Sequence, residues 1–413
     1  MYYINKHSRI NELKGIYVLC NTENRAVIGL DDKGYKDWRK ICDNDMDSVT
    51  DVEFIKTLYE LEFISKSAYE YKDNIEVLSA YVHVTNKCNL HCLGCYSLDD
   101  ERNKSIDPSS EELIKAFFEL DAIGVTTIVI SGGEPFLRKD LKHILQYARE
   151  NFKNLEHISL ITNGTVNVNF EEYKGLLDEI TVSVDGYSLE HSSFIRDTGI
   201  FDTIINTVKT IKQSGVPVNI LPTLHNKNYS NVTEYMLLAK ELGVEINFSI
   251  LSVCETAEFK DYILHEQGLG VLADALFDIE LPVHDVPISC ELEAGLSCGT
   301  GRTTISIAAN GNVYPCHMLH NDAFLMGNIF TQSFKEIYAN NPVVKTLDAV
   351  DVDNIEDCKG CGYKYFCAAG CRARSLYATG TILNKDSYCF LTKRYYDRTT
   401  DELIQGIEHI KNN

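Results

Sequence analysis

Six short apolar runs, each followed by a segment with helical spacing, dominate the middle of the chain. The apolar runs cover residues 80–85, 126–131, 158–162, 180–184, 216–221 and 245–251. Apolar positions recur at helical intervals near residues 113–120, 141–148, 173–177, 204–211 and 235–242. Asp107 with Pro108 predicts the start of the first helix, as a capping acid before a proline. This alternation predicts an α/β fold over residues 78–285: a partial, TIM-like (β/α)6 barrel with its chemistry in the loops after the strands.

The N-terminal residues 1–77 follow a different pattern and predict a separate unit. Two alternating runs, 15–20 and 25–30, are joined by polar residues, as in a β-hairpin. Helical stretches follow near residues 35–41 and 52–61. A hairpin with helices at this length has the size of a winged-helix module. The alternative is an N-terminal cap that covers one face of the next domain.

The C-terminal part of the chain loses the strand–helix rhythm. Residues 286–392 are rich in cysteine and have few apolar runs. Such a segment has little core of its own, so we expect bound metal to supply the missing stability. Residues 393–413 predict a final helix, with Leu403, Ile407 and Ile410 on one face.

Length and charge narrow the class of protein. A chain of 413 residues exceeds the roughly 250–300 residues of a single core, so we expect two or three domains. The formal charge of −21 excludes a general nucleic-acid binder, which needs basic surfaces. No signal peptide and no apolar run of about 18 residues is present, so we expect a cytoplasmic protein without a membrane partner.

Fourteen cysteines are the most distinctive feature of the composition. In a long chain without an export signal, clustered cysteines indicate metal binding more than disulfides. Cys88, Cys92 and Cys95 follow the first strand of the predicted barrel directly. Three thiolates can hold three irons of a 4Fe–4S cluster and leave the fourth iron open. The alternatives are a zinc site that lacks one ligand, or buried free thiols.

The Cys-x3-Cys-x2-Cys spacing after a first strand resembles the radical S-adenosylmethionine (SAM) superfamily. The resemblance implies that the amino and carboxylate groups of SAM chelate the open iron, and that reduction cleaves SAM to a 5′-deoxyadenosyl radical. In the family the residue before the third cysteine is often aromatic. Here Gly94 stands before it and Tyr96 after it, which departs from the expected packing over the adenine.

Further motifs at the ends of later strands fit the same resemblance. Ser131-Gly132-Gly133-Glu134-Pro135 resembles the family's Gly-Gly-Glu-Pro motif, which binds the methionine amino group. Glycines allow close backbone approach, and a carboxylate accepts hydrogen bonds from an ammonium group. By the same resemblance, Ser183 and Arg196 would hold the SAM carboxylate, although Arg196 could equally form a surface ion pair. The other expected SAM contacts are Tyr96, Thr162, Asn163, Asp185 and Leu221, with Thr223 beside the adenine site.

A second cysteine pattern occupies the C-terminal part. Cys298-x12-Gly311-x4-Cys316, then Cys358-x2-Cys361-x5-Cys367-x3-Cys371, and finally Cys389 resemble the SPASM domain of radical SAM enzymes. The resemblance implies two auxiliary clusters, and therefore three 4Fe–4S clusters besides SAM. The outer cluster would be bound by Cys358, Cys361, Cys367 and Cys389. The inner cluster would be bound by Cys298, Cys316 and Cys371, with Cys290 as the expected fourth ligand.

Two points about these cysteines stay open. If Cys290 is not a ligand, the inner cluster has an open iron for substrate. Zinc at Cys358, Cys361, Cys367 and Cys371 is the alternative to the outer cluster. The isolated Cys20, Cys42 and Cys254 are expected to be buried structural thiols.

The resemblance favours a maturase of a ribosomally made precursor peptide. Related enzymes grip the leader peptide by adding a strand to an N-terminal winged-helix module, which residues 1–77 match in size and order. The expected product is a cross-linked peptide, with a thioether, carbon–carbon or ether bond, and the expected electron donor is a flavodoxin or ferredoxin.

Two other functions compete. Sulfatase-maturating enzymes generally lack the N-terminal unit and carry an acidic base after the cysteine that corresponds to Cys316. Here that position is His317, which is the one candidate base because histidine can accept a proton near neutral pH. A non-catalytic iron–sulfur electron carrier is the third possibility, but it needs neither an open iron nor a Gly-Gly-Glu-Pro motif.

Overall fold

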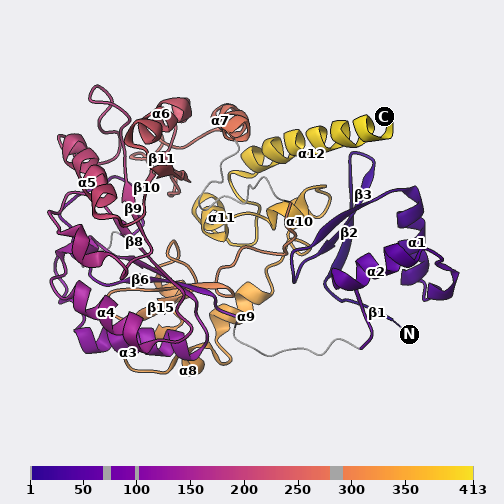
Figure 1. Ribbon diagram of the computed structural model, residues 1–413, viewed down its shortest axis with the longest axis horizontal. Coiled ribbons are helices and arrows are strands. Elements are labelled where there is room, and N and C mark those ends of the chain that lie inside the picture. The colour runs from indigo at the N-terminus through magenta and orange to yellow at the C-terminus, as the bar shows by residue number, and fades with distance from the viewer. Residues whose placement is uncertain (1, 68–75, 98–101, 280–291, 413) are drawn as a thin grey trace.

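The computed structural model describes residues 2–67, 76–97, 102–279 and 292–412, with side chains to residue 406 (Figure 1). Of the helices in these ranges, none combines the length and apolar character needed to cross a bilayer.

A parallel sheet forms the middle of the chain, as the sequence predicts. Its six strands are β6 (Ser79–His83), β7 (Thr127–Ser131), β8 (His157–Thr162), β9 (Glu179–Ser183), β10 (Val218–Leu221) and β12 (Glu245–Ile246). They lie side by side in the order β12-β10-β9-β8-β7-β6, and every neighbouring pair is parallel. A second parallel pair, β11 (Thr223–Leu224) with β13 (Ser249–Ile250), follows the last two strands.

Four of the predicted helices connect these strands. They are α3 (Ser110–Ala122), α4 (Leu141–Asn151), α5 (Phe201–Ser214) and α6 (Val232–Leu242). The helix predicted near 173–177 is wrong, because a short 3-10 turn at Phe170–Tyr173 connects β8 to β9 instead. Alternate strand residues such as Ala80 and Val82 join the hydrophobic core with helix residues such as Phe117.

The start of α3 differs from the prediction. Ser109 is the N-cap and forms a capping box with Glu112. The Ser109 hydroxyl accepts a hydrogen bond from Glu112 N, and the Glu112 carboxylate accepts one from Ser109 N. Asp107 instead accepts hydrogen bonds from Thr85 Oγ1 at 2.6 Å and Lys87 Nζ at 2.9 Å. The acid before the proline therefore stabilises the loop after β6 and does not cap the helix.

The C-terminal region adds strands to the same sheet, and the sequence pattern does not predict these strands. Strand β14 (Thr304–Ile307) pairs in parallel with β6, and β15 (Asn312–Tyr314) and β16 (Gly327–Asn328) extend the sheet antiparallel. Ile305, Ile307 and Val313 are fully buried in the same hydrophobic core as the parallel strands. The expectation that this region has little core is therefore wrong, because it contributes many buried apolar side chains to a core that it shares with the parallel sheet.

Short helices and one long helix complete the C-terminal region. The short helices are α8 (Phe334–Tyr338), α9 (Pro342–Asp348), α10 (Lys364–Cys367) and α11 (Arg372–Thr379). The predicted final helix is confirmed as α12 (Cys389–Asn412), which runs beside α7 (Glu266–Ile279) in Figure 1. Leu403 is 48% exposed, and the side chains of Ile407 and Ile410 lie outside the described residues, so the predicted apolar face is not confirmed.

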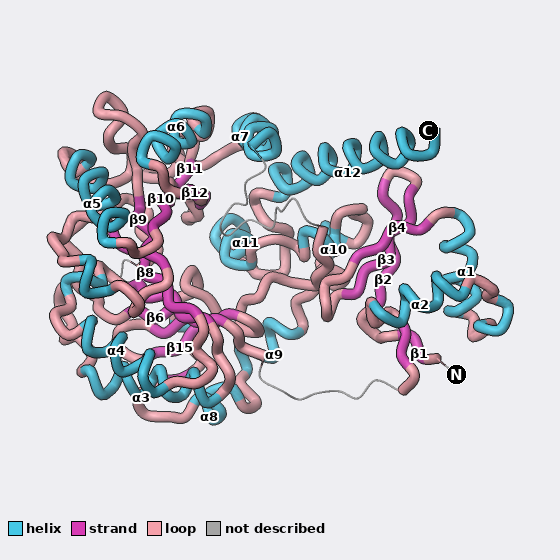
Figure 2. Tube along the Cα trace, in the orientation of Figure 1, coloured by secondary structure: helices cyan, strands magenta, loops and turns pink. Residues whose placement is uncertain are grey.

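The N-terminal residues form a small unit with its own hydrophobic cluster. The predicted hairpin is β3 (Ile16–Asn21) with β4 (Val27–Leu30). A third antiparallel strand, β2 (Ser8–Leu13), pairs with β3 and is not predicted by the sequence pattern. The predicted helices are α1 (Asp32–Cys42) and α2 (Val52–Glu60), and a short strand pair joins β1 (Tyr3–Ile4) to β5 (Ile64–Ser65). This unit lies beside α10 and α12, at the far end of the molecule from the parallel sheet (Figure 2). Its interpretation as a winged-helix module stays a prediction.

Candidate functional site

The first cysteine motif lies in the loop that follows β6. Cys88, Cys92 and Cys95 are all partly buried. A hydrogen-bond donor lies beside each sulfur: Asn163 Nδ2 at 3.8 Å from Cys88, Arg196 Nη1 at 3.4 Å from Cys92, and Arg102 Nη2 at 3.9 Å from Cys95. Two of these donors are guanidinium groups. Burial raises the pKa of Cys92, and the charge of Arg196 opposes this shift and so favours the thiolate form that binds metal. The three side chains therefore fit the ligands of an anionic iron–sulfur cluster.

Gly132 and Gly133 press the end of β7 against the start of this cysteine loop. Gly133 N donates to Thr85 O at 2.8 Å, and the next amide, Glu134 N, donates to Lys87 O at 2.7 Å. A Cβ atom at Gly133 would lie 2.0 Å from Lys87 O, and one at Gly132 would lie 2.4 Å from Thr85 O. The close approach that the glycines allow is therefore to the cysteine loop itself. Contact with SAM by these two residues stays a prediction.

The Glu134 carboxylate is fully buried and ties the end of β7 to the end of β8. It accepts hydrogen bonds from Thr162 Oγ1 at 2.8 Å, Asn163 N at 2.8 Å and Phe136 N at 3.1 Å. Burial raises the pKa of Glu134, while these hydrogen bonds oppose the shift. Pro135 then begins a short 3-10 turn. Glu134 thus fixes Asn163 beside Cys88, and its expected bond to the SAM amino group stays a prediction.

Asp185, after β9, shapes the loop that carries Arg196. Its Oδ2 accepts from the backbone amides of Phe194, Ile195 at 2.9 Å and Arg196 at 3.2 Å. Its other oxygen, Oδ1, is buried and has no hydrogen-bond partner within the described ranges. Asp185 therefore positions the arginine whose guanidinium reaches Cys92, and Arg196 is not a simple surface ion pair.

The same loop holds the cysteine loop from its other side. Leu93 N donates to Ile195 O at 2.7 Å, and His91 N donates to the Asp197 carboxylate at 3.2 Å. Hydrogen bonds from the loops after β7 and β9 thus hold the cysteine loop from two sides.

The remaining expected SAM contacts lie along the same edge of the sheet. The hydroxyl groups of Tyr96 and Ser131 share a hydrogen bond of 2.5 Å, and Tyr96 is 40% exposed. Ser183 and Leu221 face each other in register at the ends of β9 and β10. Thr223 begins β11, with its hydroxyl 3.1 Å from that of Ser249. The structure therefore gathers these residues at the carboxyl ends of the strands.

Burial and neighbouring charge act on the thiols of the expected outer set. Burial raises the pKa of Cys358 to about 11, and the charges of Cys389 and Cys361 raise it further. The pKa of Cys367 is raised well above its ordinary value by burial, and by the charges of Cys389, Cys358 and Cys361. The binding of one cluster by Cys358, Cys361, Cys367 and Cys389 stays a prediction.

The predicted inner set is partly visible. Burial raises the pKa of Cys371 to about 11, and the charge of Cys298 adds to the shift. Cys316 is partly buried, and its place in the inner set stays a prediction. Cys290 lies outside the described residues. Within those residues, no group of three or more His, Cys, Asp or Glu side chains is placed to hold a single metal ion.

His317 lies between the two cysteine regions. It is buried, and its ring stacks on Tyr81 with 4.2 Å between centroids. Its ring also meets the edge of Tyr96, at 5.2 Å, and its Nδ1 lies 3.8 Å from Cys316 Sγ. His317, the candidate base, therefore contacts both cysteine regions. It touches Tyr96, which follows Cys95, and Cys316, its own neighbour in the second motif.

Several site residues were missed from the sequence. Arg102 beside Cys95, and the buried Arg372, Arg374 and Asp386 among the C-terminal cysteines, follow no recognised motif. Their nearness to cysteine motifs in sequence was the available signal. The expectation of buried structural thiols holds for Cys20 but is wrong for Cys42 and Cys254, which are exposed.

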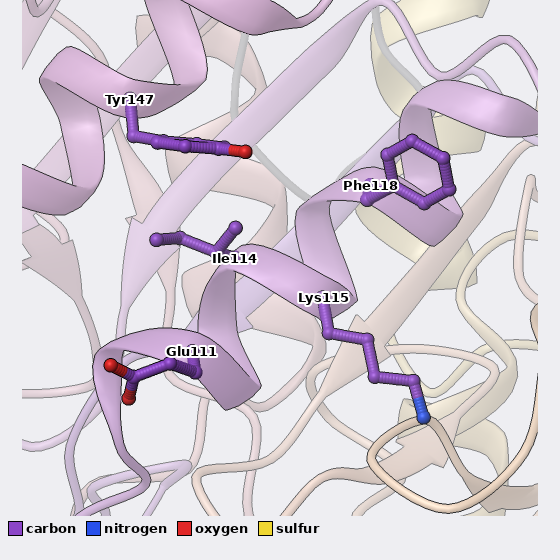
Figure 3. A pocket seen from close by; sticks show the side chains of 5 residues that line it. All are labelled: Glu111, Ile114, Lys115, Phe118 and Tyr147. Atoms are coloured by element: carbon purple, nitrogen blue, oxygen red, sulfur yellow. The ribbon is translucent and has the colours of Figure 1, made fainter.

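A depression of about 440 Å³ lies on the outer helices, away from these side chains. Glu111, Ile114, Lys115 and Phe118 of α3 and Tyr147 of α4 line it (Figure 3). Lys115 Nζ is used in a bond to Phe330 O at 2.7 Å. This depression has no part in the arrangement at the strand ends.

Two family models match the chain. The model of the Radical SAM superfamily matches residues 82–239, and that of the SPASM iron–sulfur cluster-binding domain matches residues 298–362. These ranges contain the two cysteine regions described above, except that Cys367, Cys371 and Cys389 lie beyond the second match.

Three curated relatives are similar to this chain. AdoMet-dependent heme synthase of Methanosarcina barkeri is 28% identical over 340 residues, which cover 74% of this chain and 94% of that protein. Mycofactocin maturase MftC of Mycobacterium tuberculosis is 24% identical, over 74% of this chain and 81% of that protein. The antilisterial bacteriocin subtilosin biosynthesis protein AlbA of Bacillus subtilis is 30% identical, over 65% of this chain and 61% of that protein.

Two solved structures share the fold. The structure of anSMEcpe with bound AdoMet has a TM-score of 0.65 and 22% identity, and covers 79% of this chain and 98% of that chain. Streptococcus suis SuiB bound to the precursor peptide SuiA has a TM-score of 0.59 and 16% identity, and covers 94% of this chain and 100% of that chain. The likeness to SuiB therefore extends over much of the N-terminal unit.

Proposed function

We propose that this chain, a radical SAM enzyme with a C-terminal SPASM domain, is a maturase that cross-links a ribosomally made precursor peptide. The observation that carries the proposal is the N-terminal unit, which has its own hydrophobic cluster and is docked on the SPASM region. Two relatives are named for maturation or bacteriocin biosynthesis, and SuiB was solved with a precursor peptide. These names support a peptide substrate.

The docking of the N-terminal unit involves one edge of its three-stranded sheet and leaves the other edge for a peptide. Asn11 in β2 donates to the carbonyls of Gly362, at 2.6 Å, and Cys361, at 3.4 Å, so this edge faces the SPASM region. Arg9 and Lys14 at the ends of β2 pair with Asp353 and Asp401. The sheet order is β2-β3-β4, so β4 is the opposite edge. We assign the leader peptide to β4, because an edge strand offers main-chain groups for strand addition.

The described residues fit the groups that the family implies. With a 4Fe–4S cluster and SAM bound, the loop after β6 would supply a 5′-deoxyadenosyl radical. Cys88, Cys92 and Cys95 would hold the cluster, and Arg196, already placed by Asp185, would bind the SAM carboxylate. Cross-linking removes two hydrogens from the peptide. One would leave as an atom in 5′-deoxyadenosine, and the other would leave as a proton with its electron accepted by an auxiliary cluster, if one is held by the C-terminal thiols.

The two C-terminal thiol sets would hold these auxiliary clusters, which makes three clusters in all. Their expected role is to accept the substrate electron and return it to a flavodoxin or ferredoxin.

Sulfatase maturation, with formylglycine as its product, is the second candidate. The observation in its favour is His317, a buried imidazole that lies between the two cysteine regions, where that reaction needs a base. The N-terminal unit has no evident use in such a reaction, so we rank this candidate second.

Mass spectrometry tests the proposal. Short peptides encoded beside the gene are incubated anaerobically with reconstituted enzyme, SAM and reductant. Loss of two hydrogens from one peptide is the expected result, and thiol alkylation then separates a thioether from a carbon–carbon bond. A Cys92→Ala variant should form neither product nor 5′-deoxyadenosine. Release of 5′-deoxyadenosine with no change in any neighbouring peptide would contradict a peptide maturase and favour a protein substrate.

A further inference from the structure

A chain of buried polar side chains begins at Asp185, the residue that positions Arg196. The main-chain carbonyl of Asp185 accepts a hydrogen bond from the hydroxyl of Tyr235, in α6, at 2.5 Å. That hydroxyl in turn accepts a bond from Asn228 Nδ2 at 3.0 Å, and the same amide nitrogen donates to Thr223 O at 3.0 Å. Tyr235 and Asn228 are both fully buried. The loop after β9 is therefore tied to β11 through two buried side chains.

The protons of this network have one consistent arrangement. A carbonyl oxygen only accepts, so the Tyr235 hydroxyl donates its single proton to Asp185 and must accept from Asn228. Asn228 Oδ1 accepts from His225 N at 2.7 Å, which fixes the orientation of the amide group. Both amide hydrogens of Asn228 are then used, one for Tyr235 and one for Thr223. A buried network whose groups are satisfied in this way is rigid, so it holds its two ends at one separation.

The two ends of the network belong to different parts of the expected SAM site. At one end, Asp185 Oδ2 accepts from Arg196 N at 3.2 Å, and the Arg196 guanidinium lies 3.4 Å from Cys92 Sγ. At the other end is Thr223, which is expected beside the adenine. SAM carries its carboxylate and its adenine on opposite ends of the molecule, so a site that binds both groups must hold their protein partners at a matching separation.

We propose that Tyr235 and Asn228 are positioning residues for SAM, which fix Arg196 relative to Thr223 through the Asp185 main chain. The inference rests on the proposed function, because it takes Arg196 as the partner of the SAM carboxylate. Neither side chain needs to touch SAM. The network keeps the guanidinium where the carboxylate of an adenine-anchored SAM arrives, so its loss weakens binding of SAM more than binding of a ligand that has only the adenosine part.

Binding of SAM and of 5′-methylthioadenosine, which lacks the amino and carboxylate groups, to reconstituted full-length enzyme tests the proposal. Tyr235→Phe removes only the hydroxyl, and the ring keeps its edge contacts with Tyr187 at 5.3 Å and Phe248 at 6.3 Å. We expect SAM binding to weaken about tenfold, while 5′-methylthioadenosine binding stays within about twofold of wild type. In SAM cleavage without peptide, the KM for SAM should rise by the same factor, with kcat within about threefold.

Tyr338→Phe is the matched control. It removes a tyrosine hydroxyl that also donates to a main-chain carbonyl, Gly301 O at 3.0 Å, but in the C-terminal region. Both affinities should equal those of the wild type. Equal weakening of the two ligands by Tyr235→Phe would mean that this hydroxyl only supports the fold, and would overturn the proposal.

A double-mutant cycle shows whether Tyr235 acts through Arg196. Arg196→Gln alone should weaken SAM binding, and Tyr235→Phe should add less than about twofold in that background. Full additivity of the two substitutions overturns the proposal. Normal SAM binding by Arg196→Gln would contradict the carboxylate assignment and overturn the inference with it.

Asn228→Asp keeps the proposal testable if Tyr235→Phe yields too little folded enzyme. This variant keeps the side-chain size and the acceptor for His225 N but loses both N–H donors, so it breaks the network at its other end. A selective loss of SAM affinity supports the inference, and unchanged SAM affinity overturns it. The selective loss without any peptide product would count against the maturase alone.

Discussion

The barrel and the C-terminal region both present cysteines, but they hold them by different means. In the barrel, three cysteines share one loop, which is fixed by main-chain bonds such as Gly133 N to Thr85 O and Leu93 N to Ile195 O. In the C-terminal region, the cysteines come from separate segments that buried charged side chains join. Asp386 accepts from Cys371 N at 2.7 Å, and its own carbonyl accepts from Cys389 N at 3.0 Å. The first site is held by backbone contacts, and the second by buried charged side chains.

The largest expected effect is a break in the backbone fit of the barrel site. Gly133→Ala would place a methyl group 2.0 Å from Lys87 O, so the loop that carries Cys88 has to move. We expect loss of SAM cleavage by at least 100-fold, measured as 5′-deoxyadenosine by chromatography. Gly406→Ala is the control, because a Cβ there meets no atom within 4 Å. Normal cleavage by Gly133→Ala would show that the cysteine loop does not depend on this contact.

The next effect separates the two sites chemically. Cys361→Ala removes a predicted ligand of the outer cluster but leaves the loop after β6 intact. SAM cleavage without peptide should continue within about threefold of wild type, while modified peptide should fall below detection by mass spectrometry. Cys42→Ser, at an exposed thiol of the N-terminal unit, is the matched control. Undiminished peptide product from Cys361→Ala would refute an auxiliary-cluster role.

Removal of iron should distinguish the two regions in stability. Because bound clusters contribute folding free energy, a chelator should raise amide hydrogen exchange about tenfold or more over residues 352–391, whose separate segments carry the expected cluster ligands. Amides of β7, β8 and β9 should keep their protection, since their side chains form the shared hydrophobic core. Equal loss of protection in both regions would mean that the barrel also needs its cluster to fold.

The smallest effect is expected at the contact between α7 and α12. Asp274 pairs with Arg394 through bonds of 2.9 and 3.0 Å, and this partner lowers the pKa of Asp274. Asp274→Asn should lower the Tm only slightly, because the pair is largely exposed. Because the pKa of Asp274 is lower in the folded protein, the ion pair stabilises the fold fully above the unfolded pKa near 3.8. This stabilisation is lost as the pH falls through the folded pKa. The Tm difference should therefore stay constant from pH 8 to pH 5. A double-mutant cycle with Arg394→Gln isolates the pair, and a difference that disappears between pH 8 and pH 5 would exclude this origin.

Local patterns in the sequence predicted the parallel strands and the motifs at their ends, because each lies within one strand and its loop. Two local signals compete at the start of α3. The Asp107–Pro108 pair predicts one start, whereas the capping box of Ser109 and Glu112 forms the observed one. Pairings between distant segments were out of reach. The four residues Thr304–Ile307 carry no pattern that predicts β6 as their strand partner. Nothing in the sequence around Arg374 predicts Asp386 as its ion-pair partner.

The pairing of β14 with β6 limits how the protein can be divided. Thr304 to Ile307 lie in register with Ser79 to Val82, so the C-terminal region covers one whole edge of the parallel sheet. A fragment that ends after α7 would expose the main-chain amides and carbonyls of β6, and such an edge templates pairing between copies. We expect this fragment to self-associate into insoluble material, whereas the intact chain does not offer that edge. The two cysteine regions should therefore be expressed as one piece.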